Sequence, residues 1–338
     1  MRVLFLLLPM LLVIPPETHA APADAERCEI GLVLGSGGAA GLAHIELLRV
    51  FDELEIQPSR IAGTSIGAVI GVLYASGLEA ATIEGIFNEF GGSGLDTITG
   101  LIRGNNGLDL RDVMNLDLEN GGLVDAQGFI DFLQAQTPAR SFDDLRIPME
   151  IITTDYWTGQ PVVRSTGPLF EAVQASMAVP GLFSPVRSGE QLLIDGGTTN
   201  PLPIDRLRAD CDRVIAIDVS GARPRPGDET AAEFSDLLFG SFELMQQALI
   251  AQSLKQHRPD LYLKPEIRNV RLLHFNRIRS VLEQTAPEAR RLRNYLQALV
   301  RHHEREESNH DPDQRIPETG IRSDHGPREH MTRTRSTP

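Results

Sequence analysis

The sequence lacks several features that would assign it to a common class of protein. No internal repeat recurs at a fixed period, which argues against solenoids and propellers. No Cys/His cluster has the spacing of metal ligands, so neither a metal nor another cofactor is expected. Basic residues are in deficit, because 32 Lys and Arg face 46 Asp and Glu, for a formal net charge of −14. Such a surface repels phosphate backbones and anionic headgroups, so we expect no nucleic-acid partner, and any transient membrane contact should use apolar surface.

The first 20 residues read as an export signal and not as part of the fold. Arg2 supplies a small basic start, residues 3–14 form an apolar core, and the residues up to Ala20 fit a cleavage site. The apolar stretch is too short to cross a bilayer and is broken by Pro9. The sequence therefore predicts an exported protein, either periplasmic or secreted.

Only two cysteines occur, Cys28 and Cys211, and each lies shortly before an apolar run. If the two runs are neighbouring parallel strands, their starts lie about 5 Å apart, within disulfide reach. Export also permits oxidation. Strand order cannot be read from the sequence, so a disulfide and two unpaired buried thiols are equal alternatives.

Short runs rich in Val and Ile alternate with helical patterns along the chain. Residues 42–54 and 66–77 separate such runs and carry apolar positions at helical spacing. This alternation predicts an α/β fold, a three-layer α/β/α arrangement with a mostly parallel central sheet. The expected strands are EIGLVLG, RIAGTS, IPMEIITTD, QPVVRS, QLLIDGG and RVIAIDVS.

The remaining segments are expected to surround this sheet. Residues 91–125, crowded with Gly, Asn and Leu, form either a lid over an apolar substrate or a solvent-covered insertion. Residues 231–256 are expected to form a helix packed on the sheet, with its Met and Phe stripe in the core. An edge strand, DLYLKPEI, and two short helices ending near Arg301 should follow. The domain should thus span 26–302, before a polar, disordered tail over 303–338.

Three expected strands end in residues suited to one site. The first ends in LGSGGAAG, residues 34–41, whose glycines let N–H groups approach an anion at a helix start. The second ends in GTSIG, where Gly63 and Gly67 leave room for a strained turn that presents the Ser65 hydroxyl. A third, LIDGG, places Asp195 at a strand end. Because the ends of parallel strands share one sheet edge, we expect these stretches to converge.

Two other families use similar patterns. In a chain this rich in glycine, a G-x-S-x-G motif arises by chance about one time in eight. Gly35, Gly37 and Ala40 fit a dinucleotide fingerprint, but the next strand ends in GTS and lacks the acidic residue that would hold a ribose. An ordinary α/β-hydrolase would add His257 or His274, but it reaches its nucleophile only after several strands, and here one strand precedes the serine.

Four stretches resemble the signature blocks of the patatin-like phospholipases, in the right order: GLVLGSGGAAGLAHIELL, IAGTSIGAVIGVLYASG, ASMAVPGLFSPV and LIDGGTTNPLP. The match extends over roughly residues 29–225 and more weakly to about 300, and the chain resembles the bacterial members, including exported ones. The resemblance implies an α/β fold, a Ser–Asp dyad without a histidine base, and hydrolysis of acyl esters of lipids. Carried over by motif, Ser65 is the nucleophile and Asp195 the base. The oxyanion hole would be the N–H groups of Gly37, Gly38 and Ala39, and the motif glycines are Gly63, Gly67 and Gly196.

The glycine-rich block departs from the family pattern G-G-G-x-R-G at two positions. Ser36 replaces the first glycine and Ala40 the basic residue. Main-chain stabilisation of an oxyanion survives a side-chain change, whereas a lost cation weakens the positive field of the site or reflects a different head group. We expect a serine lipid acyl hydrolase, phospholipase A- or lysophospholipase-like. The alternatives are a carboxylesterase for soluble short-chain esters and a catalytically weak lipid-binding module.

Other conspicuous residues receive structural interpretations. His44 lies on the first expected helix and is interpreted as structural. Asp155 and Gly159 are expected to form the turn between two strands. Trp157 either borders the pocket or covers that hairpin. For Asp195 itself, a partly dry pocket is expected to raise the pKa of the carboxyl from about 3.9 and make it a better base.

Overall fold

The computed structural model describes residues 27–93, 126–221 and 234–310, and divides into two compact units, residues 1–295 and 296–338. The fold below is that of the first unit. The predicted export signal, most of the predicted lid and the last part of the predicted tail lie outside the described residues. Those three expectations therefore stay predictions.

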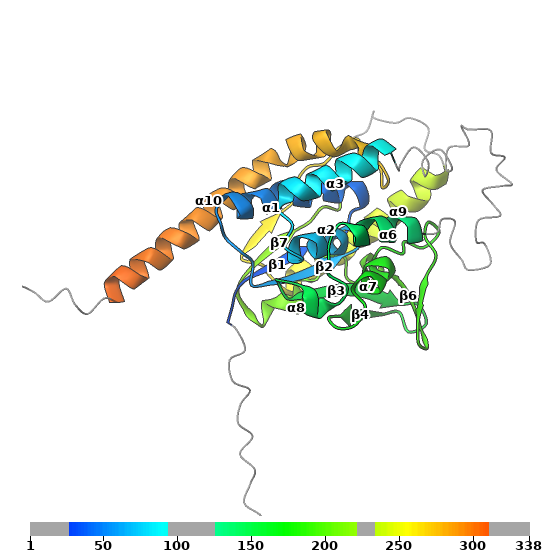
Figure 1. Cartoon of the computed structure of the whole chain (residues 1–338), viewed down its shortest axis with the longest axis horizontal. Helices are drawn as coiled ribbons and strands as arrows, with labels where there is room; N and C mark the ends of the chain where they lie inside the picture. The colour runs from blue at the N-terminus through cyan, green and yellow to red at the C-terminus, as the bar shows by residue number, and fades with distance from the viewer. Residues whose placement is uncertain (1–26, 94–125, 222–233, 311–338) are drawn as a thin grey trace, which may run out of the picture. The chain divides into compact units, whose positions relative to one another are not determined.

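One eight-stranded sheet forms the centre of the first unit (Figure 1). Its strands are β1 (Cys28–Leu34), β2 (Arg60–Thr64), β3 (Met149–Asp155), β4 (Gln160–Arg164), β5 (Val186–Ser188), β6 (Gln191–Asp195), β7 (Cys211–Ile217) and β8 (Leu261–Leu263). Their order is β5-β6-β3-β2-β1-β7-β8, and β4 pairs with β3 outside this path. The pairs β2–β3, β1–β2, β1–β7 and β7–β8 are parallel, and those of β4 and β6 with β3 and of β5 with β6 are antiparallel.

The predicted α/β fold with a mostly parallel central sheet is thus confirmed, and each expected strand is present. The centre is parallel because β1, β2 and β7 are apolar on both faces, as strands covered by helices on both sides must be. The antiparallel pairs all involve β3 or β6: β4 and β6 pair with β3, and β5 pairs with β6. The expected edge strand, β8, indeed pairs only with β7 among the described strands.

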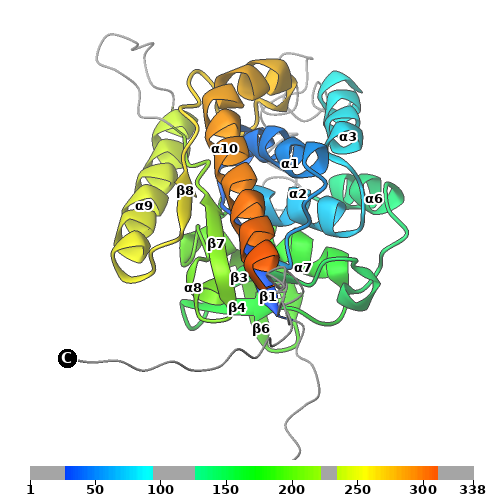
Figure 2. The ribbon, with the colours of Figure 1, turned by 90° about the vertical axis from the view of Figure 1, so that its left-hand side faces the viewer.

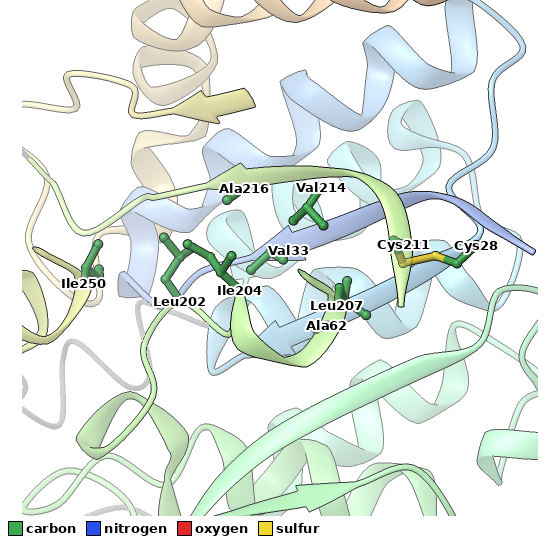
Figure 3. Close-up of a cluster of buried hydrophobic side chains, with 10 residues drawn as sticks. All are labelled: Cys28, Val33, Ala62, Leu202, Ile204, Leu207, Cys211, Val214, Ala216 and Ile250. Carbon is green, nitrogen blue, oxygen red and sulfur yellow. A yellow bond between two sulfur atoms is a disulfide. The ribbon is translucent and has the colours of Figure 1, made fainter. Parts of the chain in front are cut away.

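Helices cover both faces of the sheet (Figure 2). The described α-helices are α1 (Ala43–Glu53), α2 (Ile66–Ala75), α3 (Ala80–Ser93), α6 (Gln127–Ala135), α7 (Leu169–Ser176), α8 (Asp205–Arg208), α9 (Phe234–Gln256) and α10 (Ile278–His310), of which residues 278–295 belong to the first unit. Successive residues of β1 point to opposite faces. A Cβ at Gly71 of α2 would lie 3.2 Å from Leu34, whereas Val33 belongs to a buried cluster with Leu207 of α8 and Ile250 of α9 (Figure 3).

The same cluster contains a disulfide between Cys28 and Cys211 (Figure 3). The two residues are register partners at the start of β1 and β7, with a Cα–Cα distance of 4.5 Å. Of the two alternatives that the sequence left open, the structure therefore has the disulfide. It joins two strands whose cysteines are separated by 183 positions.

Two expectations for the later helices are wrong. The chain forms one helix, α10, which continues past Arg301 to His310, where two shorter helices were expected. It persists through Pro287 because the buried residues Val281, Thr285, Ala289 and Leu292 keep a spacing of three or four. On α9, Met245 is 59% exposed, so the methionine expected in the core lies on the surface.

Candidate active site

Ser65 lies in the sharp turn between β2 and α2. Its backbone has φ 56° and ψ −122°, a conformation that costs energy for any residue other than glycine. The carbonyl oxygen of Ser65 already accepts hydrogen bonds from the N–H groups of Ala68 and Val69, in the first turn of α2. The turn thereby directs the Ser65 side chain away from the end of β2. The residue is 7% exposed.

The register of the sheet brings Asp195 to this turn. Thr64, the last residue of β2, pairs with Ile152 of β3, and the next residue of β3, Thr153, pairs with Asp195 of β6. Asp195 thus occupies the place beside β3 that the chain of β2 leaves at Ser65. The Oγ of Ser65 donates a hydrogen bond of 2.6 Å to Oδ2 of Asp195. The expected convergence is present, although β6 arrives antiparallel, against the expectation of parallel strands.

The carboxyl group of Asp195 is completely buried. Its Oδ1 accepts a hydrogen bond of 2.6 Å from the N–H of Gly197. Burial raises the pKa of Asp195 to about 7, against the opposing effect of the hydrogen bonds from Ser65 and Gly197. A proton acceptor with a pKa near 7 is well matched to general-base catalysis at neutral pH.

Ser176, at the end of α7, holds the Ser65 turn, and sequence reasoning missed it. Its Oγ accepts a hydrogen bond of 2.9 Å from the N–H of Ser65 and donates one of 2.6 Å to the carbonyl oxygen of Ile152. The hydroxyl therefore joins the Ser65 turn to β3, directly after the last pair of β2 with β3, Thr64 with Ile152. Two residues further on, the carbonyl oxygen of Ala178 accepts the N–H of Asp195 at 2.9 Å. In the sequence, the ASMAVPG block is only a family signature. The spacing of its residues does not show what the Ser176 hydroxyl contacts.

The glycine-rich turn after β1 packs directly on the Ser65 turn. A Cβ at Gly67 would lie 2.1 Å from the carbonyl oxygen of Leu34 and 2.8 Å from that of Gly35, so only glycine permits this approach. The motif glycines Gly63 and Gly196 are equally crowded, by Gly67 and Ile152 respectively. The structure therefore places two of the predicted site segments in contact.

The N–H groups of this turn differ in their availability. Among the described residues, we find no acceptor for the N–H of Gly37 or of Gly38. That of Ala39 donates a hydrogen bond of 2.8 Å to the carbonyl oxygen of Leu272. Gly38 has φ +54°, and a side chain there would overlap Leu272. Of the three N–H groups predicted to form an oxyanion hole, that of Ala39 is therefore already used, whereas no described residue accepts those of Gly37 and Gly38.

Ser36, which departs from the family pattern, has a partner on α9. Its Oγ donates a hydrogen bond of 3.0 Å to Oε1 of Gln246, and both side chains are buried. The amide group of Gln246 also lies against Gly197, where a Cβ would come within 2.2 Å of Nε2. One glutamine therefore contacts both the glycine-rich turn and the segment that binds the carboxyl of Asp195. Ala40, the other departure, is buried.

The histidines do not join the Ser65–Asp195 pair. Among the described residues, the carboxyl of Asp195 is hydrogen-bonded to Ser65 and Gly197, so neither His257 nor His274 completes a triad. His44 is completely buried, and its Nε2 lies 2.9 Å from the carbonyl oxygen of Gly35. Burial lowers the pKa of His44 to about 4, so at neutral pH an uncharged ring supports the glycine-rich turn.

The turn between β3 and β4 is formed as expected. The carboxyl group of Asp155 accepts hydrogen bonds from the N–H of Trp157 at 3.2 Å and the hydroxyl of Thr158 at 2.9 Å. Gly159 closes the turn with φ +65°. Trp157 is 62% exposed and in edge contact with Tyr156.

Neither a metal site nor a membrane span is found in the part of the chain that the structure describes. There, no group of three or more His, Cys, Asp or Glu side chains is arranged to hold a metal ion. No helix among these residues combines the length and the apolar character needed to cross a bilayer.

Comparisons with known proteins identify the family of this chain. The model of the family described as "Patatin-like phospholipase" matches residues 32–208. An uncharacterized NTE family protein of Mycobacterium tuberculosis is 29% identical over 302 residues, which cover 80% of this chain and 48% of that protein. Patatin-like phospholipase domain-containing protein 7 of Rattus norvegicus is 32% identical over 67% of this chain and 16% of its own length. This chain therefore spans about half the length of the mycobacterial relative and much less of the rat one.

Among solved structures, VipD from Legionella pneumophila is similar with a TM-score of 0.46 and 16% identity, over 79% of this chain and 67% of that one. The family model covers more than half of this chain, from the middle of β1 to α8, and so includes Ser65, Ser176 and Asp195. This chain belongs to the patatin-like phospholipase family.

Proposed function

We propose that this protein is an exported serine lipid acyl hydrolase, phospholipase A- or lysophospholipase-like, that cleaves carboxylic esters through Ser65 and Asp195. The observation that carries the proposal is the buried hydrogen bond of 2.6 Å between Oγ of Ser65 and Oδ2 of Asp195. Membership in the patatin-like phospholipase family supports a lipid ester as the substrate class. The choice between phospholipid and lysophospholipid rests on the resemblance alone.

The reaction would proceed in two steps. In the first, Asp195 takes the proton of the Ser65 hydroxyl while Oγ attacks the ester carbonyl carbon. The oxyanion of the tetrahedral intermediate would be stabilised by the N–H groups of Gly37 and Gly38. As the intermediate collapses, the alcohol leaves with the proton from Asp195, and the acyl group stays on Ser65.

In the second step, water replaces the alcohol. The water oxygen attacks the carbonyl carbon of the acyl group while Asp195 takes a proton from that water. The N–H groups of Gly37 and Gly38 would stabilise the new oxyanion. Collapse returns the proton to Oγ of Ser65 and releases the fatty acid. The pKa of Asp195, raised to about 7 by burial, lets one carboxyl accept and return the proton in both steps.

A fluorophosphonate probe tests the nucleophile directly. We expect it to label the wild-type protein and Ser253→Ala, a control on α9, but not Ser65→Ala, and to label Asp195→Asn far more slowly. Labelling of Ser65→Ala at the wild-type rate would refute the assignment. A series of p-nitrophenyl esters of increasing chain length, assayed beside phospholipid and lysophospholipid, tests the substrate class. Turnover confined to short soluble esters would identify a carboxylesterase, and lipid binding without turnover an inactive module.

A further inference from the structure

The exposed large apolar side chains of the first unit gather on two elements. Among its described residues, every such side chain lies either on α9 or in the turn between β3 and β4. They are Tyr156, Trp157, Leu238, Leu244, Met245 and Leu249. Scattered exposed apolar residues need no explanation, but a concentration on two elements indicates a binding surface.

Both elements adjoin the candidate active site. On α9, Gln246 is hydrogen-bonded to Ser36 in the glycine-rich turn. One end of the same helix lies near Gly181, where a Cβ would be 3.7 Å from Leu238, in the loop after α7. The other element begins at Tyr156, directly after the strand in which Thr153 pairs with Asp195. The exposed apolar side chains therefore lie around the same edge of the sheet as the dyad.

The outer side of α9 takes no part in the core. Its inner side is fixed by two buried residues, Gln246 and Ile250, the second of which belongs to the cluster of Figure 3. Leu238, Met245 and Leu249 are spaced seven and four residues apart, so they align along the helix. We call these three residues the apolar face of α9. Met245 is 59% exposed, more than a core position would permit.

The three residues of the apolar face are uncharged, and the one charged residue between Leu238 and Leu249, Glu243, is partly buried. From Leu244 to Leu254 the helix has no acidic or basic residue, although the whole chain carries a formal net charge of −14. Attraction between opposite charges therefore cannot be what holds a partner on this face. Tyr156 and Trp157 add rings with an apolar body and a polar tip, the type of side chain enriched where a bilayer meets water.

We propose that the apolar face of α9, with the Tyr156–Trp157 turn as a second contact, docks the protein on an electrically neutral lipid surface. The inference rests on the proposed function, because an acyl hydrolase must reach esters that are packed in lipid aggregates. Docking through α9 holds the site close to the lipid, because Gln246, on the inner side of the helix, contacts both Ser36 and Gly197. Affinity comes from apolar burial, and the net negative charge of the chain opposes anionic lipid.

Flotation with vesicles tests docking separately from catalysis. The full chain carrying Ser65→Ala, which prevents turnover, is mixed with phosphatidylcholine vesicles, and its partition is measured. We expect Met245→Glu to lower the partition at least about tenfold and Leu249→Gln to lower it several-fold, because each removes an apolar side chain from the contact.

Asn294→Glu adds the same charge at an exposed position of α10 and should leave the partition unchanged. Adding phosphatidylglycerol to the vesicles should weaken binding at low salt and not at high salt.

Unchanged partition of Met245→Glu, or binding that grows with the content of anionic lipid, would overturn the inference. A second copy of the chain on the same face would also overturn it. In that case sedimentation would show a dimer that Met245→Glu converts to a monomer, without vesicle binding by either. Turnover assays with protein that retains Ser65 separate a failure of docking from a failure of the proposed function. If wild type docks but hydrolyses no ester, the proposed function is wrong and docking stands. If Met245→Glu loses activity equally on vesicles and on a soluble ester, the residue acts on the fold and not on docking.

Discussion

Replacing Asp195 by Asn should make the folded protein more stable at alkaline pH while abolishing its activity. The carboxyl is completely buried, and burial raises its pKa from 3.8 to about 7. Above pH 7 the folded protein must therefore keep a charge away from water, with two hydrogen bonds and no cation in contact among the residues that the structure describes. An amide has nearly the same shape, carries no charge and still offers an oxygen to the N–H of Gly197.

The magnitude follows from the two pKa values. Between about pH 4 and 7, the folded state holds a proton on Asp195 that the unfolded state has lost, so unfolding becomes easier as the pH rises. At about 1.4 kcal/mol per pKa unit, the shift from 3.8 to about 7 corresponds to about 4 kcal/mol. The amide of the Asp195→Asn variant does not titrate, so the stability of this variant relative to wild type should rise by roughly 3 kcal/mol from pH 5 to pH 8 and then stay constant.

The comparison with wild type is essential because other buried groups titrate in the same range. Burial lowers the pKa of His44 to about 4, so this residue makes stability rise with pH between about 4 and 6.5, opposite to Asp195. Burial raises the pKa of Glu243 to about 7, and this residue acts in the same direction as Asp195. Both are present in wild type and variant, so their contributions cancel in the difference.

Urea unfolding of both proteins at several pH values between about 5 and 9 measures this difference. A gap that does not change with pH would refute the assignment of a pKa near 7 to Asp195, whatever its sign. A stability of Asp195→Asn relative to wild type that falls as the pH rises would show that the charged form is the one stabilised in the fold. Fluorophosphonate labelling of the same samples checks that the more stable variant has lost reactivity at Ser65.

Three further outcomes follow. The value of kcat/KM for a soluble ester should rise with pH to a plateau, with a midpoint near 7 set by Asp195, and a midpoint near 4 would contradict the buried-base mechanism. Ser176→Ala should lower kcat more than KM and cost about 1–3 kcal/mol in urea unfolding, because it leaves the N–H of Ser65 buried without an acceptor. Ser176→Thr, which keeps the hydroxyl, should recover part of kcat, and equal activity of both variants would refute the positioning role. Replacing Cys28 and Cys211 by Ser should lower the free energy of unfolding by about 2–5 kcal/mol without changing the labelling of Ser65, since the bridge closes a loop of 183 positions.

The sequence predicted the central sheet from its apolar strands, and the roles of Ser65 and Asp195 from the resemblance to a family. Parallel strands buried on both faces must be apolar along their length, and the residues that follow them must collect at one edge. This argument predicted that the two stretches converge, and their side chains are hydrogen-bonded although 130 positions separate them. The antiparallel arrival of β6 could not be foreseen, because strand direction depends on which neighbours pair and leaves no local pattern.

The availability of individual N–H groups was also beyond the sequence. Gly37, Gly38 and Ala39 look equivalent as a stretch of small residues, yet Ala39 is used by the carbonyl oxygen of Leu272, more than 200 positions away. Ser176 was missed for the same reason, since its partners are Ser65, directly after β2, and Ile152 of β3. Periodicity indicates which residues are buried, whereas a hydrogen-bond partner distant in sequence is fixed only by the completed fold.

The wrong expectation for α9 has a physical cause that connects it to function. Helical spacing of three and four predicts one apolar side, but α9 has an inner side that carries a buried glutamine, Gln246, and an outer side that carries Leu238, Met245 and Leu249. A helix that served only the core would place the glutamine outside and the methionine inside. The inversion is explained if the inner side must donate and accept hydrogen bonds at the active site while the outer side meets an apolar phase. The polar residue inside and the apolar residues outside would then be two requirements of one task, which is to hold a hydrolytic site against lipid.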